Sequence, residues 1–380
     1  MAIQARSPHF ESVSVSGLSY GILKIYIWTG DKNTDVPINP EYTIRKSATT
    51  PTTGNPRVTF EVAELIRDFL DIEFDGNYSG QGVWVRFELN GYDSSDVSII
   101  NYAYTIDSFD GYKYFEEVFT PSPLMITNRK LFVLEDNTFR VPIYTNSSPT
   151  VTFLKDNEVV GTTSFTQSDE SSEQIKYVSI YGDDTNWDSF KERVLENGGT
   201  DYESNKCLEA YFNDYSIGAV DKIIVSDIGG IKTINVSILE ECKYEPKKVT
   251  FVNKYGALQD MYFFKKSVES MNIEKESYKS NILNASSYNS YNHVYRDFNV
   301  MGRESVTLSS GFLSEEYNEV FKQMMLSEKV WITNITEDGE QVLPINVKTG
   351  DITYKTSLND KLVQYTIEFD KSYDTINNIR

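Results

Sequence analysis

Histidine, the most common general base and metal ligand in proteins, occurs only twice in this chain of 380 residues. His9 lies near the N-terminus and His293 lies among tyrosines, so a surface or packing role is the simpler interpretation of each. No Gly-x-Ser-x-Gly elbow, Walker A loop or Gly-x-Gly-x-x-Gly fingerprint is present. Gly229-Gly230 predicts a hairpin turn. The sequence therefore predicts no catalytic residue and no cofactor site.

Two acidic clusters have the composition of a cation site. The run Asp31–Asp35 begins like an EF-hand loop, but Val36 replaces the required glycine and Tyr42 replaces the final glutamate. A polar hairpin loop explains this run better. A turn followed by a helix cap explains the second cluster, which comprises Asp183, Asp184 and Asp188. We therefore expect no metal site.

Carboxylates and aromatic residues leave two alternatives open. A glycoside hydrolase needs two carboxylates in an aromatic-rich cleft, and this chain contains both residue types without a spacing that brings them together. A sugar-stacking surface could use Trp28, Trp84 and Trp187, although core packing is the usual role of such residues. A carbohydrate- or receptor-binding protein is thus one alternative, and a glycosidase is a further one.

The charge of the chain restricts its partners. The sequence contains 36 Lys+Arg and 56 Asp+Glu, a net charge of −20 at pH 7, which repels nucleic-acid phosphates and anionic membranes. No apolar run approaches the ~20 residues of a membrane-spanning helix, and the N-terminus lacks the apolar core of a signal peptide. We expect a soluble protein with protein partners, no specific nucleic-acid binding and no membrane insertion.

The composition also favours strands. Aromatic residues make up 13% of the chain, with 26 Tyr and 21 Phe, and such residues pack well on pleated surfaces. Cys207 and Cys242 are far apart, which suggests two reduced thiols rather than a disulfide framework. The expected fold class is mainly β: a multi-domain chain of small, Ig-like β-sandwich modules with a few short helices and a C-terminal α+β module.

Residues 1–122 predict an N-terminal β-rich domain. The apolar spacing over 62–70 predicts one amphipathic helix. Strands are expected at 22–28, 82–89, 101–106 and 112–119, with a turn at Asn90-Gly91.

Residues 123–246 predict a β-sandwich domain, with a short helix over 188–195. Its strands are expected at 130–134, 139–144, 151–154, 159–165, 175–181, 223–225 and 232–239.

Residues 247–380 predict a third domain. A strand over 249–252 leads into a turn at Asn253–Gly256. The stretch Ser277–Tyr295 has no clean periodicity and predicts either an extended arm or an ordinary loop. Ser314 is the expected N-cap of a helix whose apolar face runs from Tyr317 to Met325. Further strands are expected at 329–333, 342–347, 351–356 and 362–369, the last with one buried face.

Parts of this third domain resemble virion proteins of tailed bacteriophages that infect Bacteroidetes, including crAss-like phages. One such segment runs from Val249 to Asp260 and continues into Tyr262-Phe263-Phe264. The other is the Ser-capped helix, followed by Leu326–Trp331 and a closing hairpin that ends on Tyr354–Asp360 and Tyr365–Phe369. The resemblance covers roughly the last third of the chain and concerns architecture rather than a catalytic motif.

The resemblance implies a tail, neck, connector or baseplate protein whose copies form a symmetric ring and dock other virion proteins. It also implies that the C-terminal module is of phage-tail type, and that the protein is located in the virion after assembly in the host cytoplasm. An arm at Ser277–Tyr295 suits such a ring, because tyrosine supplies contact area at a low entropic cost. We therefore expect a structural protein and not an enzyme.

Overall fold

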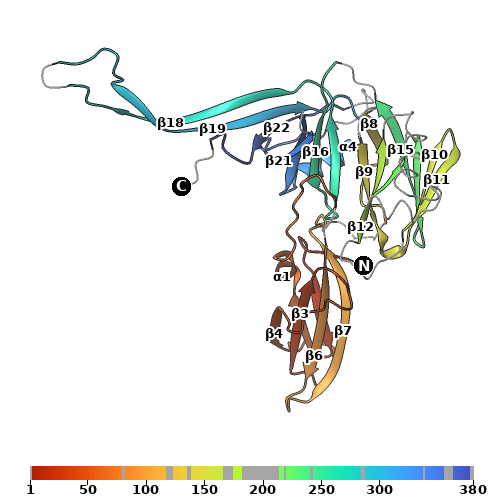
Figure 1. The fold of residues 1–380 in the computed structure, drawn as a ribbon. Helices are drawn as coiled ribbons and strands as arrows, with labels where there is room; N and C mark the ends of the chain where they lie inside the picture. The colour runs from red at the N-terminus through yellow and green to blue at the C-terminus, as the bar shows by residue number, and fades with distance from the viewer. Residues whose placement is uncertain are drawn as a thin grey trace.

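The computed structural model describes residues 2–78, 82–116, 123–134, 138–165, 174–181, 214–217, 220–239, 243–283, 287–336, 339–354 and 363–376. Within these ranges the strands form sheets of five, five, three, seven and two strands, and the fold is mainly β as the sequence predicts (Figure 1). The described α-helices are α1 (Ala63–Arg67) and α4 (Tyr317–Met325). No helix in this part of the chain is long and apolar enough to cross a membrane.

The N-terminal part consists of two packed sheets. The larger has the order β1 (Ile3–Gln4), β7 (Ser98–Phe109), β6 (Gly82–Tyr92), β3 (Tyr20–Trp28) and β4 (Tyr42–Ser47). The smaller pairs β2 (Phe10–Ser14) with β5 (Arg57–Glu61). Buried side chains of both sheets form one core, which includes Val13, Val58, Phe60, Leu23, Phe87 and Leu89.

The turn predicted at Asn90-Gly91 is wrong, because both residues continue β6 and pair with β7. The chain turns at Asp93 instead, whose carboxylate accepts hydrogen bonds from the backbone N–H of Ser95 (2.8 Å) and Val97 (3.0 Å). Gly91 serves packing: a Cβ there would lie 2.7 Å from the side chains of Ile100 and Leu18. The strand predicted at 101–106 is confirmed as part of β7, which is longer than expected. The strand predicted at 112–119 is wrong over residues 112–116, which form no strand, and residues 117–119 lie outside the described residues.

The strands predicted between 130 and 239 are confirmed in two sheets. One has the order β11 (Glu158–Ser164), β10 (Thr150–Lys155), β14 (Lys222–Asp227), β15 (Gly230–Leu239) and β8 (Lys130–Leu134). The other has the order β13 (Asp214–Ile217), β12 (Ile175–Tyr181) and β9 (Thr138–Tyr144). A 3-10 turn lies at Thr145–Ser147. The helix predicted at 188–195 lies outside the described residues.

The C-terminal part contains one seven-stranded sheet. Its order is β17 (Leu258–Phe263), β16 (Lys247–Val252), β20 (Val330–Thr336), β21 (Gly339–Val347), β22 (Thr366–Lys371), β19 (Tyr295–Ser309) and β18 (Val268–Lys279). Helix α4 packs against it through Phe321, whose ring lies 6.2 Å from that of Phe263 in β17 and 4.5 Å from that of Tyr365, just before β22. The predicted helix face and the buried face of the last strand are therefore confirmed.

Two local predictions in this part are wrong. Helix α4 has Glu316 as its N-cap, and the Ser314 hydroxyl is buried without a hydrogen-bond partner. The Ser314 backbone carbonyl instead accepts a hydrogen bond from the Tyr317 N–H, 3.0 Å away, so a backbone turn starts the helix. The strand expected at 351–356 is absent over 351–354, and the remainder lies outside the described residues.

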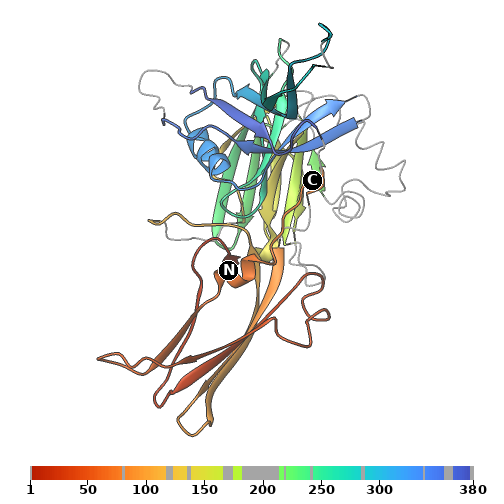
Figure 2. The ribbon, with the colours of Figure 1, turned by 90° about the vertical axis from the view of Figure 1, so that its left-hand side faces the viewer.

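The hydrophobic core does not follow the boundaries drawn from the sequence. One buried cluster contains side chains between Leu124 and Val236 together with side chains between Val249 and Phe369. The sheets of the second and third parts thus share a core and lie side by side in both views, whereas the N-terminal sheets extend away from them (Figures 1 and 2). The division into domains 1–122, 123–246 and 247–380 stays a prediction.

Candidate assembly interface

A buried aromatic joint connects all three parts of the chain. The N-terminal part contributes Phe74 and Tyr78, the middle part contributes Tyr144 and Tyr177, and the C-terminal sheet contributes Trp331. The Tyr78 ring lies 4.9 Å from that of Phe74 and 5.1 Å from that of Tyr177. Edge-to-face aromatic pairs of this kind have a preferred geometry, so the joint orients the three parts as well as burying apolar surface.

Buried hydrogen bonds fix the same joint. The Tyr144 hydroxyl donates to Asp107 of β7 (2.7 Å), and the Tyr78 hydroxyl donates to Asp260 of β17 (2.6 Å). Burial and the nearby Asp107 carboxyl raise the pKa of Tyr144, so its hydroxyl stays protonated as a donor. Burial also raises the pKa of Asp107, although the hydrogen bond from Tyr144 opposes this. Polar groups buried in this way hold one geometry, because a shift would leave them unsatisfied.

Ion pairs reinforce the contact between the N-terminal sheet and the C-terminal part. Arg67 contacts Asp110 at 3.5 Å and also pairs with Glu328. Arg6 lies 3.3 Å from the same Glu328. Lys329 pairs with Asp71 and donates to the Ile72 carbonyl at 2.8 Å. The aromatic joint and these ion pairs together hold the N-terminal part at one angle to the middle and C-terminal parts. We call this joined unit the bracket.

A long two-stranded hairpin projects from this body. We call residues 268–304 the hairpin arm; it contains β18 and the first ten residues of β19 (Figure 1). Strand β22 pairs with β19 only over Ser305–Ser309, so the arm leaves the sheet beyond that point. All twelve residues of β18 and the first six of β19 are exposed. At about 3.3 Å per residue, the twelve residues of β18 span roughly 40 Å.

The arm concentrates exposed apolar side chains. Ten of the 24 exposed large hydrophobic residues in the described ranges lie on it: Val268, Met271, Ile273, Tyr278, Leu283, Tyr288, Tyr291, Tyr295, Phe298 and Val300. The arm is also almost neutral, with five acidic and four basic residues, which leaves 51 acidic and 32 basic residues, or −19, for the rest. Exposed apolar clusters of this extent are typical of surfaces that bind a partner.

Ser277–Tyr295, for which the sequence left an extended arm or a loop open, forms the ends of the two hairpin strands at Ser277–Lys279 and Tyr295, and its other described residues connect these strands. The described residues of this stretch form the outer part of the hairpin, and β18 begins nine residues earlier, at Val268. Sequence reasoning missed β18 and β19 because the hairpin is exposed on both faces. Such strands carry no apolar alternation. The enrichment in tyrosine and asparagine lies in the residues that connect these strands.

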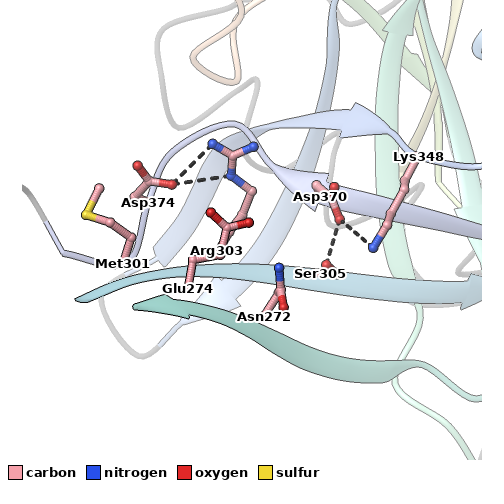
Figure 3. Close-up of a pocket in the computed structure, with 9 residues that line it drawn as sticks. Asn272, Glu274, Met301, Arg303, Ser305, Lys348, Asp370 and Asp374 are labelled. Atoms are coloured by element: carbon pink, nitrogen blue, oxygen red, sulfur yellow. Dashed lines mark hydrogen bonds and ion pairs between the residues drawn. The ribbon is translucent and has the colours of Figure 1, made fainter. Parts of the chain in front are cut away.

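One face of the arm base carries a polar cavity of about 440 Å³ (Figure 3). Four of its charged groups contact one another or Ser305: Arg303 lies 3.2 Å from Asp374, and Asp370 accepts from Ser305 (2.6 Å) and lies 3.4 Å from Lys348. Glu274 also lines the cavity. These contacts attach the C-terminal segment and β22 to the arm. The contacts around the cavity therefore support the root of the arm.

The opposite face of the arm base carries a more apolar cavity of about 260 Å³. Met271, Val306, Ile332 and Ile345 form its apolar wall. Its charged lining residues include Lys371, which pairs with Glu304, and that hydrogen bond raises the pKa of Lys371. We call this cavity the base pocket.

The candidate cation loop satisfies its own polar groups. The Asp31 carboxylate accepts the backbone N–H of Thr34 and of Asn33, each at 2.7 Å, and these bonds lower the pKa of Asp31. The loop is a side-chain-capped turn, as interpreted from the sequence. No group of three or more potential metal ligands occurs among the described residues. Asp183, Asp184 and Asp188 lie outside them.

The histidines occupy different settings. His9 packs on Phe87, with ring centroids 6.2 Å apart, and its Nε2 lies 3.0 Å from Glu11. Burial alone would raise the pKa of Glu11, but hydrogen bonds with His9 and from Tyr104 and Tyr102 outweigh burial and lower it. This cluster ties β2 to β7 inside the N-terminal part. His293 is exposed near the end of the arm.

Trp28 and Trp84, two of the tryptophans considered for sugar stacking, are buried and form no exposed surface. Trp84 is fully buried and Trp28 is 7% exposed. Their indole N–H groups donate to the backbone carbonyls of Gly30 (3.0 Å) and Asp31 (2.9 Å). Trp187 lies outside the described residues. The exposed aromatic side chains of the described residues include the arm tyrosines Tyr278, Tyr288, Tyr291 and Tyr295.

Comparison with models of known protein families and with curated proteins finds no match to this chain.

Proposed function

We propose that this protein is a structural virion protein that forms a symmetric ring in the neck, tail or baseplate of a tailed bacteriophage and docks neighbouring virion proteins. The observation that carries the proposal is the apolar, nearly neutral hairpin arm on a joined body. In this proposal the packed sheets are Ig-like sandwich modules, the C-terminal sheet with α4 is a tail-type module, and the protein is not an enzyme. The resemblance of the C-terminal third to virion proteins supplies the phage context.

The physical argument is that a ring requires two properties of its subunit. The angle between interfaces must be constant, and the aromatic joint with its buried hydrogen bonds provides a fixed bracket. Each copy must also reach its neighbour across a repulsive, acidic surface, and the arm provides that reach. A two-stranded hairpin is only marginally stable alone, so an arm of this length gains most from being bound.

The test is the size of the purified full-length protein, measured by light scattering and negative-stain microscopy over increasing concentration. We expect closed particles of one size. Because Glu274 and Met301 pair directly, residues 275–300 can be replaced by Asn-Gly, which shortens the arm without disturbing its base. This variant should remain monomeric. The matched control, Ile228→Ser with Ile231→Ser, removes two exposed apolar residues from the β14–β15 turn and should assemble normally. A wild-type protein that stays monomeric at high concentration would contradict the proposal.

A second candidate is binding of a carbohydrate receptor by the end of the arm. The observation that favours it is the exposure of Tyr288, Tyr291 and Tyr295, which are 69%, 77% and 67% exposed. Aromatic rings of this kind stack on sugar faces. A glycan array that gives binding by the wild type, lost after these tyrosines are changed to Ala, would support this candidate, and an array without binding would remove it.

A further inference from the structure

The base pocket lies on the inner face of the curved C-terminal sheet. In the sheet register Ile345 pairs with Lys371 and Met271 pairs with Glu304, so these four side chains share one face. Ile332 and Ile345 of that face belong to the hydrophobic core, whereas Met271 is 48% exposed. The pocket is thus the place where the core-lining face of the sheet opens to the surface at the root of the arm.

The charges around the base pocket select a neutral occupant. Lys371 pairs with Glu304, and Lys247 pairs with Glu245 at 2.8 Å, so these two cations already have carboxylate partners. The rest of the lining combines the apolar wall with Glu269, whose charge acts on Lys371 and helps to raise its pKa, and with hydrogen-bonding groups such as Asn334. A phenol side chain fits this chemistry, because its ring is apolar and its hydroxyl can bond to a polar group at the rim. The volume of about 260 Å³ has room for one such ring.

The arm tip supplies that chemistry. Tyr288 and Tyr291, between the two strands of the arm, are 69% and 77% exposed. The arm has a net charge of −1, whereas the rest of the chain has −19. A contact that brings the arm of one copy onto another acidic copy therefore avoids most of the repulsion that two bodies would experience. Charge thus favours a second copy of this chain as the partner.

A copy cannot fill its own pocket with its own tip. Met271 lies in the pocket at the start of β18, and the tip lies beyond the far end of that strand, roughly 40 Å away at 3.3 Å per residue. The pairing of β18 with β19, which continues on both sides of a bulge near Lys275, keeps the hairpin extended. The tip and the pocket are therefore two different, well-separated surfaces of each subunit.

We infer that a tip tyrosine, Tyr288 or Tyr291, of one copy docks in the base pocket of the next copy. This deepens the proposed function and rests on it, because it names the partner surface for the arm. The contact is head-to-tail, and repeated head-to-tail contacts generate a ring when the rotation closes. One buried aromatic anchor in a pocket is the usual form of an interface hot spot.

The test uses two defective variants of the full chain. The tip variant carries Tyr288→Ser and Tyr291→Ser, and the pocket variant carries Met271→Arg, which places a charge on the pocket wall. Each alone should lose assembly, with association weakened about 30-fold or more, the effect of losing a hot-spot residue. Mixed in equal amounts, they should form dimers and stop there, because only one intact tip can meet one intact pocket. Light scattering and mass photometry distinguish monomers, dimers and rings.

Two controls share the chemistry of these changes. Met301→Arg places the same charge at the arm base on the opposite face, since Met301 pairs with Glu274, three residues from Met271. Tyr354→Ser removes a half-exposed tyrosine from the body. Both should assemble like the wild type. Rings formed by either defective variant, or a mixture that stays monomeric, would overturn the docking inference while leaving ring formation intact. A monomeric wild type would instead overturn the proposed function itself.

Discussion

Replacing Tyr78 by Phe tests whether the body is a fixed bracket. The Tyr78 hydroxyl donates to Asp260 at 2.6 Å inside the aromatic joint, and Asp260 also accepts from Thr250 at 2.8 Å. Burial, reinforced by Asp260, raises the pKa of Tyr78 well above its ordinary value, so the hydroxyl is a donor throughout the neutral range. The substitution removes one oxygen and keeps the ring that contacts Phe74 and Tyr177.

The expected loss of stability follows from the burial of Asp260, which is 1% exposed. Its Oδ2 has no hydrogen-bond partner in the structure, so without Tyr78 the carboxyl group would retain fewer donors than it needs. Leaving a buried acceptor unsatisfied costs about 1–3 kcal/mol. In a chain of this length, that corresponds to a shift of roughly 2 °C in melting temperature for each kcal/mol.

The assay is chemical unfolding combined with hydrogen exchange measured by mass spectrometry. Exchange should increase in β16, β17 and the segment before β6, and remain unchanged in the arm. The matched control is Tyr20→Phe, which removes a hydroxyl bonded to Asp96 at 2.8 Å on the surface, and no measurable change is expected there. Wild-type stability and unaltered exchange in Tyr78→Phe would refute the view that this contact fixes the joint.

Three further outcomes are expected. Because the pKa of Glu11 is lowered in the folded state, its contribution to stability is complete above the ordinary glutamate pKa and is lost as the pH falls through the lowered value. Urea unfolding between pH 3 and 6 should show this loss, and Glu11→Gln should weaken the pH dependence of the unfolding free energy. Gly91→Ala should destabilise the N-terminal part by about 1–3 kcal/mol, since the new methyl group would overlap Ile100, whereas Gly350→Ala, with open space around it, should be neutral in the same thermal melt. Because burial raises the pKa of Asp107, its ionised form is disfavoured in the fold, and Asp107→Asn should lose less stability at pH 7 than at pH 4 in urea titrations.

The sequence predicts the elements with one buried face and misses those without one. Strand β22 and helix α4 were found because their apolar residues recur with the period of a strand or a helix. The arm strand β18 has twelve exposed residues, so nothing in its pattern separates it from a loop. The turn prediction at Asn90-Gly91 is wrong because the glycine there has a packing role. Asn-Gly usually marks a hairpin turn, but Gly91 lies within β6, where two neighbouring side chains occupy the space that a Cβ would need.

The candidate interface is harder to predict than the strands because it depends on distant residues. The base pocket combines Met271 of β18 with Ile332 of β20 and Ile345 of β21, which only the sheet order brings together. The joint similarly places Tyr78 beside Tyr177. Sequence composition does predict one part of the candidate interface, since the tyrosine-rich stretch at 277–295 lies at the outer part of the arm. Its partner surface has no local signature.

In the proposed ring, a stiff body and an exposed arm would serve one requirement. A head-to-tail interface closes into a ring only if every copy turns the chain of contacts by the same angle, and an error at each contact accumulates around the ring. That angle is set by the path from the base pocket through the sheet to the arm tip. Strands β18 and β19 both belong to the sheet that lines the base pocket, so the arm tip and the base pocket of one copy are parts of one rigid element.

The bulge between Glu274 and Glu276 then becomes the place where the angle is adjusted, because bulges bend and twist a strand at a defined position. Deleting Asn299, one of the two β19 residues that lie opposite Lys275 at that bulge, should therefore change the number of copies per ring while leaving the docking contact intact. Class averages of the assembled particles would show this directly, and an unchanged copy number would mean that the angle is set elsewhere.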